Sequence, residues 1–185
     1  QGFWPDRSPP SGLFPPPYRL GRGRRSPAGI DALARRYAGD AADEAAIRAA
    51  VADRTLALVS CPAPSAAAEC VGAEIDRLLS ERVALRDIGV VSLRGQGATD
   101  AVHHAPRLGR HEFASAGADH MEERLVADTF LRWKGLERPV VIVADVTGPE
   151  RERFGTRMHI ALTRALAAAR IVAAPRPGEE WPGLR

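Results

Sequence analysis

The fold of this protein is decided by one stretch, which runs from Ala127 to Asp145 and reads ADTFLRWKGLERPVVIVAD. It contains a short strand-like segment, a polar turn built on Lys134 and Gly135, and a β-branched apolar run that ends in Asp145. Such a run is typical of a strand buried on both faces of a parallel sheet. Polar groups at a turn between buried strands lie at the rim of the sheet, where α/β proteins bind ligands. The stretch therefore predicts an α/β protein with a ligand site beside this turn.

Lys134 is the only lysine among the 26 basic residues, and the chain contains no asparagine. This usage indicates a coding bias rather than a physical demand, because arginine and lysine are not interchangeable. There are two equally good explanations for the single lysine. Either its site requires a compact ammonium group, or it was retained by chance.

Composition places the chain among ordinary globular proteins. Its 185 residues suffice for one domain with a sizeable core, and 45% apolar and 26% charged residues are normal values for such a domain. No apolar run is long enough to cross a membrane, and the N-terminus lacks the apolar core of a signal peptide. Cys61 and Cys70 lack metal-ligand spacing, so we expect a reducing, cytoplasmic setting. The net charge of +3 and the pI of about 9.4 are compatible with nucleic-acid binding but do not argue for it.

Strand-like and helix-like segments alternate along the chain. The strands are expected at 56–61, 88–93, 127–131, 140–145 and 169–174, with a further short strand at 111–116. Helices are expected from Ser26-Pro27 onward, with Ser26 as the N-cap, and at 41–54, 65–80, 99–109 and 147–168. Strand, crossover helix and strand in succession require parallel pairing. The fold class is therefore α/β, with a parallel sheet of about five strands and flanking helices.

Two polar features near the middle of the chain do not form a recognisable site. Arg94 to Gly97 is a glycine turn after a strand, but it lacks the G-x-x-x-x-G-K-S/T pattern of a phosphate-binding loop, so we expect a plain connection. His103 and His104 are adjacent and therefore do not face one ligand, and no cysteine or carboxylate stands at ligand spacing. We expect no metal site.

Three segments together resemble the superfamily 1 DNA helicases of the UvrD/Rep/PcrA type. Residues 129–137, TFLRWKGLE, resemble motif V of that family, and residues 157–165, RMHIALTRA, resemble motif VI. Residues 20–30 are similar to motif IV, L-x-x-N-x-R-S-T-x-x-I, with Gly23 in place of the usual asparagine. The resemblance covers residues 20–174 and implies the second RecA-like domain of such a helicase.

The two ends of the chain lie outside this resemblance. Residues 1–19 are rich in proline and are expected to form an extended leader, and residues 175–185 form a tail. The leader is either disordered or the end of a preceding domain. In the second case, the resemblance implies that Gln1, followed by Gly2, Phe3 and Trp4, belongs to motif III and contacts the nucleotide.

The resemblance assigns a nucleotide role to several residues. It implies that Arg25 and Arg164 reach the γ-phosphate, with Arg164 near the middle of the helix expected at 147–168. It implies that Glu137 accepts a hydrogen bond from the ribose and that Gly135 keeps the backbone close to the nucleotide. The same residues are also compatible with plain surface positions: Arg25 in a solvated basic loop, Arg164 on an amphipathic helix, and Glu137 paired with Arg138.

Contact with DNA is implied for the same turn. The resemblance implies that Thr129 and Arg132 contact nucleic acid and that Lys134 contacts the nucleotide. Thr129 and Lys134 stand in the motif that borders both the nucleotide and the DNA strand. Leu131 occupies a position where well-known members of the family have a histidine near DNA, and this departure weakens the expected DNA contact more than the nucleotide contact.

The sequence has neither a Walker A loop nor a D-E-x-Q motif. The resemblance therefore implies that this chain uses ATP with Mg²⁺ only together with an N-terminal RecA-like domain, to which it supplies arginines where the γ-phosphate charge develops. The expected function is the C-terminal motor domain, or a fragment, of an ATP-dependent 3′–5′ DNA helicase or translocase acting on single-stranded or duplex DNA. The alternatives are a stand-alone remnant that binds nucleic acid or a partner protein without catalysis, and an unrelated α/β nucleotide-binding enzyme.

Overall fold

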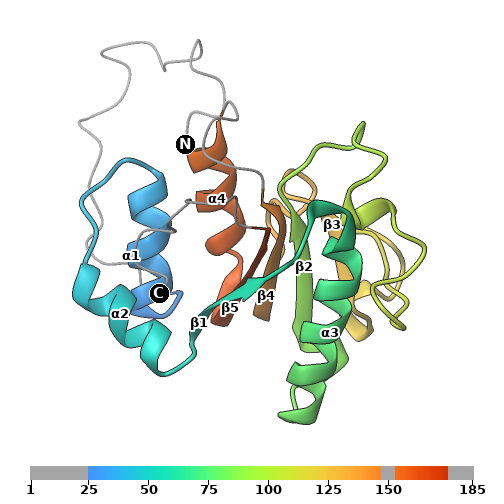
Figure 1. Cartoon of the computed structure of the whole chain (residues 1–185), viewed down its shortest axis with the longest axis horizontal. Coiled ribbons are helices and arrows are strands. Elements are labelled where there is room, and N and C mark those ends of the chain that lie inside the picture. The colour runs from blue at the N-terminus through green and yellow to red at the C-terminus, as the bar shows by residue number, and fades with distance from the viewer. Residues whose placement is uncertain (1–24, 147–152, 175–185) are drawn as a thin grey trace.

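A sheet of five parallel strands organises the protein (Figure 1). The computed structural model describes residues 25–146 and 153–174. The strands lie in the order β1-β5-β4-β2-β3, and every neighbouring pair is parallel. Their bounds are β1 Leu56–Ser60, β2 Ile88–Ser92, β3 Val126–Thr129, β4 Arg138–Val146 and β5 Ala165–Ala173. The predicted fold class and all five predicted strands are therefore confirmed.

Helices cover both faces of this sheet. They are α1 Ala28–Tyr37, α2 Glu44–Ala52, α3 Ala67–Ser80 and α4 Phe154–Leu162. Helices α1, α2 and α4 lie on one face, and α3 lies on the other (Figure 1). Asp43 caps α2, because its side chain accepts a hydrogen bond from the amide of Ala46 at 3.0 Å.

Strand β4 supplies side chains to both helix layers. Val141 and Val143 belong to the core beneath α1, α2 and α4, whereas Ile142 and Ala144 pack in the core beneath α3. Successive side chains of a strand point to opposite faces, so an unbroken apolar run is required when both faces are covered. This explains why the run from Val140 shows no alternation of polar and apolar residues.

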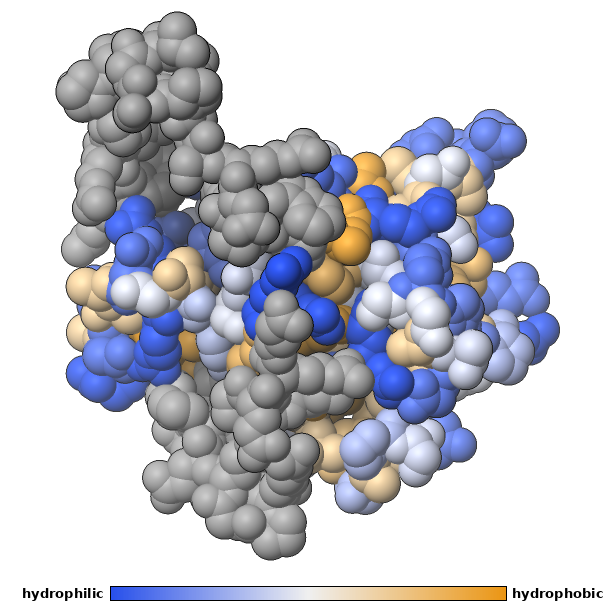
Figure 2. Space-filling view, turned by 90° about the horizontal axis from the view of Figure 1, so that it is seen from above, coloured by the Kyte–Doolittle hydropathy of each residue, from blue (hydrophilic) through white to orange (hydrophobic). Residues whose placement is uncertain are grey.

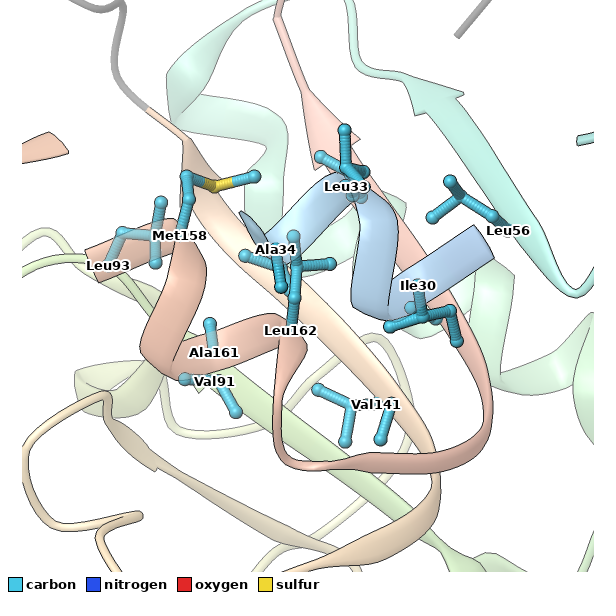
Figure 3. Close-up of a cluster of buried hydrophobic side chains, with 14 of the residues drawn as sticks. Ile30, Leu33, Ala34, Leu56, Val91, Leu93, Val141, Met158, Ala161 and Leu162 are labelled. Atoms are coloured by element: carbon cyan, nitrogen blue, oxygen red, sulfur yellow. The ribbon is translucent and has the colours of Figure 1, made fainter. Parts of the chain in front are cut away.

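The larger core lies between the sheet and the three helices on its first face. Figure 3 shows how side chains from α1, α4 and strands β1, β2 and β4 converge there. The labelled residues are Ile30, Leu33, Ala34, Leu56, Val91, Leu93, Val141, Met158, Ala161 and Leu162. All ten have no more than 1% of their surface exposed. Their burial provides the main stabilisation of the domain, because apolar area removed from water contributes about 25 cal/mol per Å².

Trp133 fixes the path of the chain between β3 and β4. Its side chain is completely buried, and its indole Nε1 donates a hydrogen bond to the carbonyl oxygen of Val90 at 3.1 Å. The ring lies directly against Gly89 in β2, where a Cβ atom would stand only 2.2 Å from the ring edge. Strand β2 therefore requires glycine at this position so that Trp133 can approach its backbone.

A buried ion pair connects α3 to β5 and was not predicted from the sequence. Glu74 and Arg170 are only 5% and 4% exposed, and their Oε1 and Nε atoms are 3.1 Å apart. Arg77 also pairs with Glu74 from one turn along the helix. Arg170 donates further hydrogen bonds to the carbonyl oxygens of Thr55 and Ala169. A buried charge needs such partners, because desolvation without them is costly.

Four expected elements differ in the structure. The helix expected at 99–109 is reduced to one 3₁₀ turn, Val102–His104, and the strand expected at 111–116 makes only isolated bridges. The helix expected at 147–168 ends at Leu162, and residues 147–152 lie outside the described residues. Ser26 is not an N-cap: Pro27 holds that position, and the Ser26 hydroxyl donates to the carbonyl oxygen of Ala165 instead.

The end of α4 differs from the expected one for a physical reason. The sequence ALTRALAAAR has high helix propensity throughout, and propensity is a weak indicator that tertiary contacts override. The backbone after Leu162 turns at once into β5, where Ala168 pairs with Val140 and Ala169 pairs with Leu56 and Val141. Pairing with β4, and from Ala169 onward also with β1, determines the conformation of these alanines.

The face seen from above is mostly hydrophilic where its residues are described (Figure 2). It shows a small apolar area among polar residues (Figure 2). Within the described residues, Leu131 and Leu166 are the exposed large apolar side chains, at 49% and 38%. None of the helices in the ranges 25–146 and 153–174 is both long enough and apolar enough to span a membrane.

Substitution of Gly89 tests the contact with Trp133. We expect Gly89→Ala to lower the free energy of unfolding by about 1–3 kcal/mol, because the added methyl group forces the indole ring out of its place. Chemical denaturation followed by tryptophan fluorescence measures the change. Gly95→Ala is the matched control, because no atom lies within 4 Å of a Cβ at that position. Equal stability of the two variants would contradict the close packing of Trp133 on β2.

Candidate functional site

Three of the predicted site residues meet at the edge of the sheet where β4 and β5 begin. Arg25 precedes α1 and forms an ion pair with Glu137, which directly precedes β4. The two side chains are 50% and 29% exposed, so the pair lies at the surface of the domain and not in its core. Arg164 directly precedes β5. We call Arg25, Glu137 and Arg164 the arginine cluster.

Arg164 was predicted to lie near the middle of a helix, and this prediction is wrong. It follows the last residue of α4 and occupies the turn between Thr163 and β5. Its Nε donates to the carbonyl oxygen of Ile160 at 3.1 Å, and its Nη2 lies 3.0 Å from the hydroxyl of Thr163. The orientation of the guanidinium group is therefore set by hydrogen bonds to the end of α4, and not by an apolar helix face.

The two arginines of the cluster are close enough to interact electrostatically. The pKa of Arg164 is lowered, first because the side chain is partly desolvated and second because the positive charge of Arg25 is nearby. Both groups remain cationic, since arginine does not lose its proton in proteins. The Glu137 carboxylate pairs with Arg25, and Arg25 in turn lies near Arg164, so the three side chains together carry one excess positive charge. Such a place favours a bound anion.

Two hydrogen bonds to backbone carbonyl oxygens hold the three segments of the cluster together. The amide of Arg138 donates to the carbonyl oxygen of Arg164 at 3.1 Å, which joins the starts of β4 and β5. The hydroxyl of Ser26 donates to the carbonyl oxygen of Ala165 at 2.8 Å, which joins the start of α1 to β5. These bonds determine where Arg25 and Glu137 lie relative to Arg164. The relative positions of the cluster residues therefore depend on the sheet.

Lys134 and Gly135 lie in the turn between β3 and β4. Gly135 has a φ of +90°, a conformation that side chains with a Cβ rarely adopt, and nothing lies within 4 Å of where a Cβ would stand. Glycine is thus required here for the turn itself. Lys134 is exposed, and within the part of the chain that the structure describes no ion pair joins it to the arginine cluster.

Thr129 and Arg132 lie at the other end of the same turn. Thr129 is 2% exposed, and its hydroxyl accepts the amide of Arg132 at 3.4 Å, so its side chain does not face solvent. Arg132 pairs with the buried carboxylate of Asp128 at 2.9 Å and donates to the carbonyl oxygen of Ala116 at 2.7 Å. Its side chain is 50% exposed. The structure places Thr129 and Arg132 at the carboxyl end of β3 and Glu137 at the amino end of β4.

Helix α4 connects the two edges of the sheet. Near its start, Arg157 donates to the carbonyl oxygen of Leu93 at 3.0 Å, and its guanidinium carbon lies 5.2 Å from the centre of the Phe130 ring. Such a cation–π contact contributes about 0.5–2 kcal/mol. The chain that follows α4 carries Arg164. One helix thus joins the turn after β3 to the arginine cluster.

A second group of polar side chains, not predicted from the sequence, lies at the carboxyl edge. Asp145 near the end of β4 accepts hydrogen bonds from the Ser92 hydroxyl at 2.5 Å and from the Val102 amide at 3.0 Å. Asp145 has a φ of +55°, which aspartate tolerates better than most residues. Burial raises the pKa of its carboxyl group, although both hydrogen bonds oppose the rise.

His103 lies beside this carboxylate. It is 9% exposed, and neither ring nitrogen has a hydrogen-bond partner. Burial lowers the pKa of His103 below its usual value, so the neutral imidazole is favoured, while Asp145 acts in the opposite direction. His104 packs against it, with ring centroids 4.3 Å apart, and the His104 ring bonds to the carbonyl oxygen of Gln96 instead of sharing a ligand.

The carboxyl edge also has the geometry of a topological switch point. The segment after β2 lies on the α3 face, where His111 is 2.9 Å from Asp76 of α3, whereas α4, the helix that follows β4 in sequence, lies on the opposite face. Ligands of open α/β sheets bind at such points. A cavity of about 30 Å³ lies there, lined in part by Cys61, Arg94 and Asp145. It has room for about one water molecule.

The described residues contain no group of three or more histidine, cysteine, aspartate or glutamate side chains placed to hold a metal ion. Gln1, predicted to contact the nucleotide, lies outside the described residues. Among the residues predicted from the sequence to form a site, Arg25, Glu137 and Arg164 are the ones that the structure brings together, so the arginine cluster is the main candidate site.

Comparisons with known proteins identify the fold. No protein-family model matches the chain, and no curated protein matches it either. Among solved structures, it is similar to the C-terminal domain of a possible DNA helicase from Lactobacillus plantarum, with a TM-score of 0.62 and 18% sequence identity. The match covers 86% of this chain and 91% of that domain. The fold is thus RecA-like, a five-stranded parallel α/β sheet with flanking helices.

Substitution of Asp145 tests its titration in the folded protein. Because the pKa of Asp145 is raised by burial, the folded state binds more protons than the unfolded state above the usual aspartate value of about 3.9. The contribution of Asp145 to the free energy of unfolding therefore falls as the pH rises through this range. Asp145→Asn keeps an oxygen acceptor and does not titrate. We expect the stability of the wild type relative to this variant to decline as the pH rises from about 4.

Urea denaturation of both proteins at a series of pH values measures this difference. Asp76→Asn is the control, because the pKa of Asp76 is lowered by its hydrogen bond with His111 and by Arg110, and its pH dependence has the opposite sign. A wild-type advantage over Asp145→Asn that grows with pH would show that the hydrogen bonds outweigh burial.

Proposed function

We propose that this chain is the C-terminal motor domain, or a fragment, of an ATP-dependent DNA helicase or translocase of the UvrD-like type. In this proposal the arginine cluster completes an ATP site whose phosphate loop and Mg²⁺-binding carboxylates belong to a separate N-terminal RecA-like domain. The observation that carries the proposal is the meeting of Arg25, Glu137 and Arg164, which are distant in sequence and were each assigned to the nucleotide from a different motif.

The charge balance of the cluster supports an anionic ligand. Arg25 and Arg164 repel each other, and the single carboxylate of Glu137 neutralises only one of them. A terminal phosphate between the two guanidinium groups would relieve this repulsion through charge-assisted hydrogen bonds. In phosphoryl transfer, an arginine supplied across a domain interface stabilises the charge that develops on the transferred group.

Glu137 has two tasks in this proposal. It forms an ion pair with Arg25 in the structure. When Arg25 turns to the phosphate, the Glu137 carboxylate becomes free to accept a hydrogen bond from a ribose hydroxyl. The exchange replaces one charge-assisted contact by another, so the cluster needs no large rearrangement of the backbone.

The turn between β3 and β4 connects nucleotide and nucleic acid in this proposal. Leu131 and Lys134 project into solvent from this turn, and Glu137 follows at its end. Arg157 of α4 stacks on Phe130 in the same turn, and the chain after α4 carries Arg164. A DNA strand that moves the turn would therefore act on Glu137 directly and on Arg164 through α4.

Arginine substitution tests the catalytic assignment. We expect Arg164→Ala to lower the ATPase rate by about a hundredfold or more, measured on the polypeptide or complex that contains the Walker A domain, because arginine fingers contribute about 10³–10⁵ in rate. Arg48→Ala is the control, since Arg48 is an exposed residue of α2. An unchanged ATPase rate for Arg164→Ala would remove the role of Arg164 and favour a binding module without catalysis.

Salt titration tests the proposed DNA contact. We expect Lys134→Ala to weaken binding of the chain to single-stranded DNA and to reduce the slope of log K against log salt by about 1, as loss of one phosphate contact requires. Lys134 is exposed, so its removal leaves the fold intact. Arg107→Ala is the control, because Arg107 is exposed and pairs with Glu112 in another loop. Equal slopes for the wild type and Lys134→Ala would exclude this contact.

A further inference from the structure

The two cysteines of the chain lie side by side. Cys61 directly follows β1, and Cys70 lies in the first half of α3. Their sulfur atoms are 2.8 Å apart, and the Cys70 thiol donates to the Cys61 sulfur. The Cys61 thiol in turn donates to the carbonyl oxygen of Ala63 at 3.1 Å. Both are free thiols in the structure.

This pair has the placement that an intramolecular disulfide requires. The sulfur atoms are separated by only about 0.8 Å more than the 2.03–2.05 Å of a disulfide bond. The nine-residue spacing includes Pro62, Pro64 and Ser65, which are exposed. The two sulfur atoms are already in contact, so bond formation needs only a small approach of the two side chains.

One member of the pair is accessible to a small reagent. Cys61 is 4% exposed, whereas Cys70 is only partly buried. Burial and the hydrogen bond with Cys61, together with the charge of Glu69, raise the pKa of the Cys70 thiol to about 11. Only the thiolate attacks a disulfide, so the reduced pair reacts slowly at neutral pH. These properties describe a dithiol that stays reduced until the surroundings become oxidising.

We propose that Cys61 and Cys70 are an oxidative modification site, where a low-molecular-weight disulfide such as glutathione disulfide converts the two thiols to an intramolecular disulfide. The Cys70 thiolate attacks the reagent, forms a mixed disulfide and releases one glutathione thiolate. The Cys61 thiolate then attacks the Cys70 sulfur and releases the second glutathione. The two cysteines lose two electrons, the reagent gains them, and the two thiol protons end on the two glutathione molecules.

The bond would staple β1 to α3 at the carboxyl edge of the sheet. It closes a short loop over the connection that enters α3, and such a loop restricts the unfolded chain. Cys61 also lines the cavity shared with Arg94 and Asp145, so oxidation changes one wall of that cavity. The site is independent of the arginine cluster, which lies where β4 and β5 begin.

Mass spectrometry of the whole chain tests the proposal. The reduced protein is equilibrated with glutathione and glutathione disulfide, remaining thiols are alkylated, and the intact mass is recorded without reductant. We expect a monomer that is lighter by two hydrogen atoms and carries no alkyl group. The chain has only two cysteines, so this mass identifies the bond. Disulfide-linked dimers, stable glutathione adducts or two alkylated thiols as the main product would each overturn the proposal.

Single substitutions and thermal unfolding complete the test. We expect neither Cys70→Ala nor Cys61→Ala to give the monomer that is lighter by two hydrogen atoms. A glutathione adduct that persists in Cys61→Ala supports Cys70 as the attacking thiol. We expect the oxidised wild type to unfold several degrees higher than the reduced wild type, a comparison that does not depend on any variant folding. An unchanged or lower melting temperature would overturn the role of the bond as a staple.

Discussion

The constraint on which the whole structure depends is the burial of one parallel sheet on both faces. Each residue of β4 between Val140 and Ala144 packs against one helix layer or the other, and a shift of one position would exchange the two sets. Parallel pairing also brings all strand starts to one edge and all strand ends to the other. The two groups of polar residues follow from this: the arginine cluster where β4 and β5 begin, and Asp145, His103 and Cys61 at the carboxyl edge.

The arginine cluster and the buried ion pair between α3 and β5 hold their charges differently, and the difference reflects solvent access. Arg25 and Glu137 are partly exposed, so their ion pair costs little to open and an anion can compete for the arginine. Glu74 and Arg170 are almost fully buried between α3 and β5, so loss of either partner would leave an uncompensated charge. The first arrangement suits a site that exchanges ligands, and the second suits a permanent link between helix and sheet.

Much of the fold could be predicted, because the apolar runs of the strands are unambiguous and the helices before them have clear periodicity. All five strands were found in this way, along with α1, α2 and α3. The errors lie where local preference and tertiary pairing disagree. Ala165 to Ala168 read as helix but join β5, and the segment 99–109 is held by the bond from the Val102 amide to Asp145 instead of by its own helix. The Asp145 and His103 group was missed because its members are 42 residues apart, and only β4 pairing with β2 brings them together.

The sequence by itself determined the α/β class and the parallel arrangement, because apolar patterning is a local property of the chain. The resemblance to short motifs only singled out Arg25, Glu137 and Arg164 as candidates. Only the tertiary structure decided that Arg164 lies in a turn and not in a helix, that Arg25 pairs with Glu137 rather than standing in a solvated loop, and that the two cysteines touch. These facts depend on strand order and register, which join residues far apart in sequence. No local pattern contains that information, because the energy of such contacts arises only when the sheet has formed.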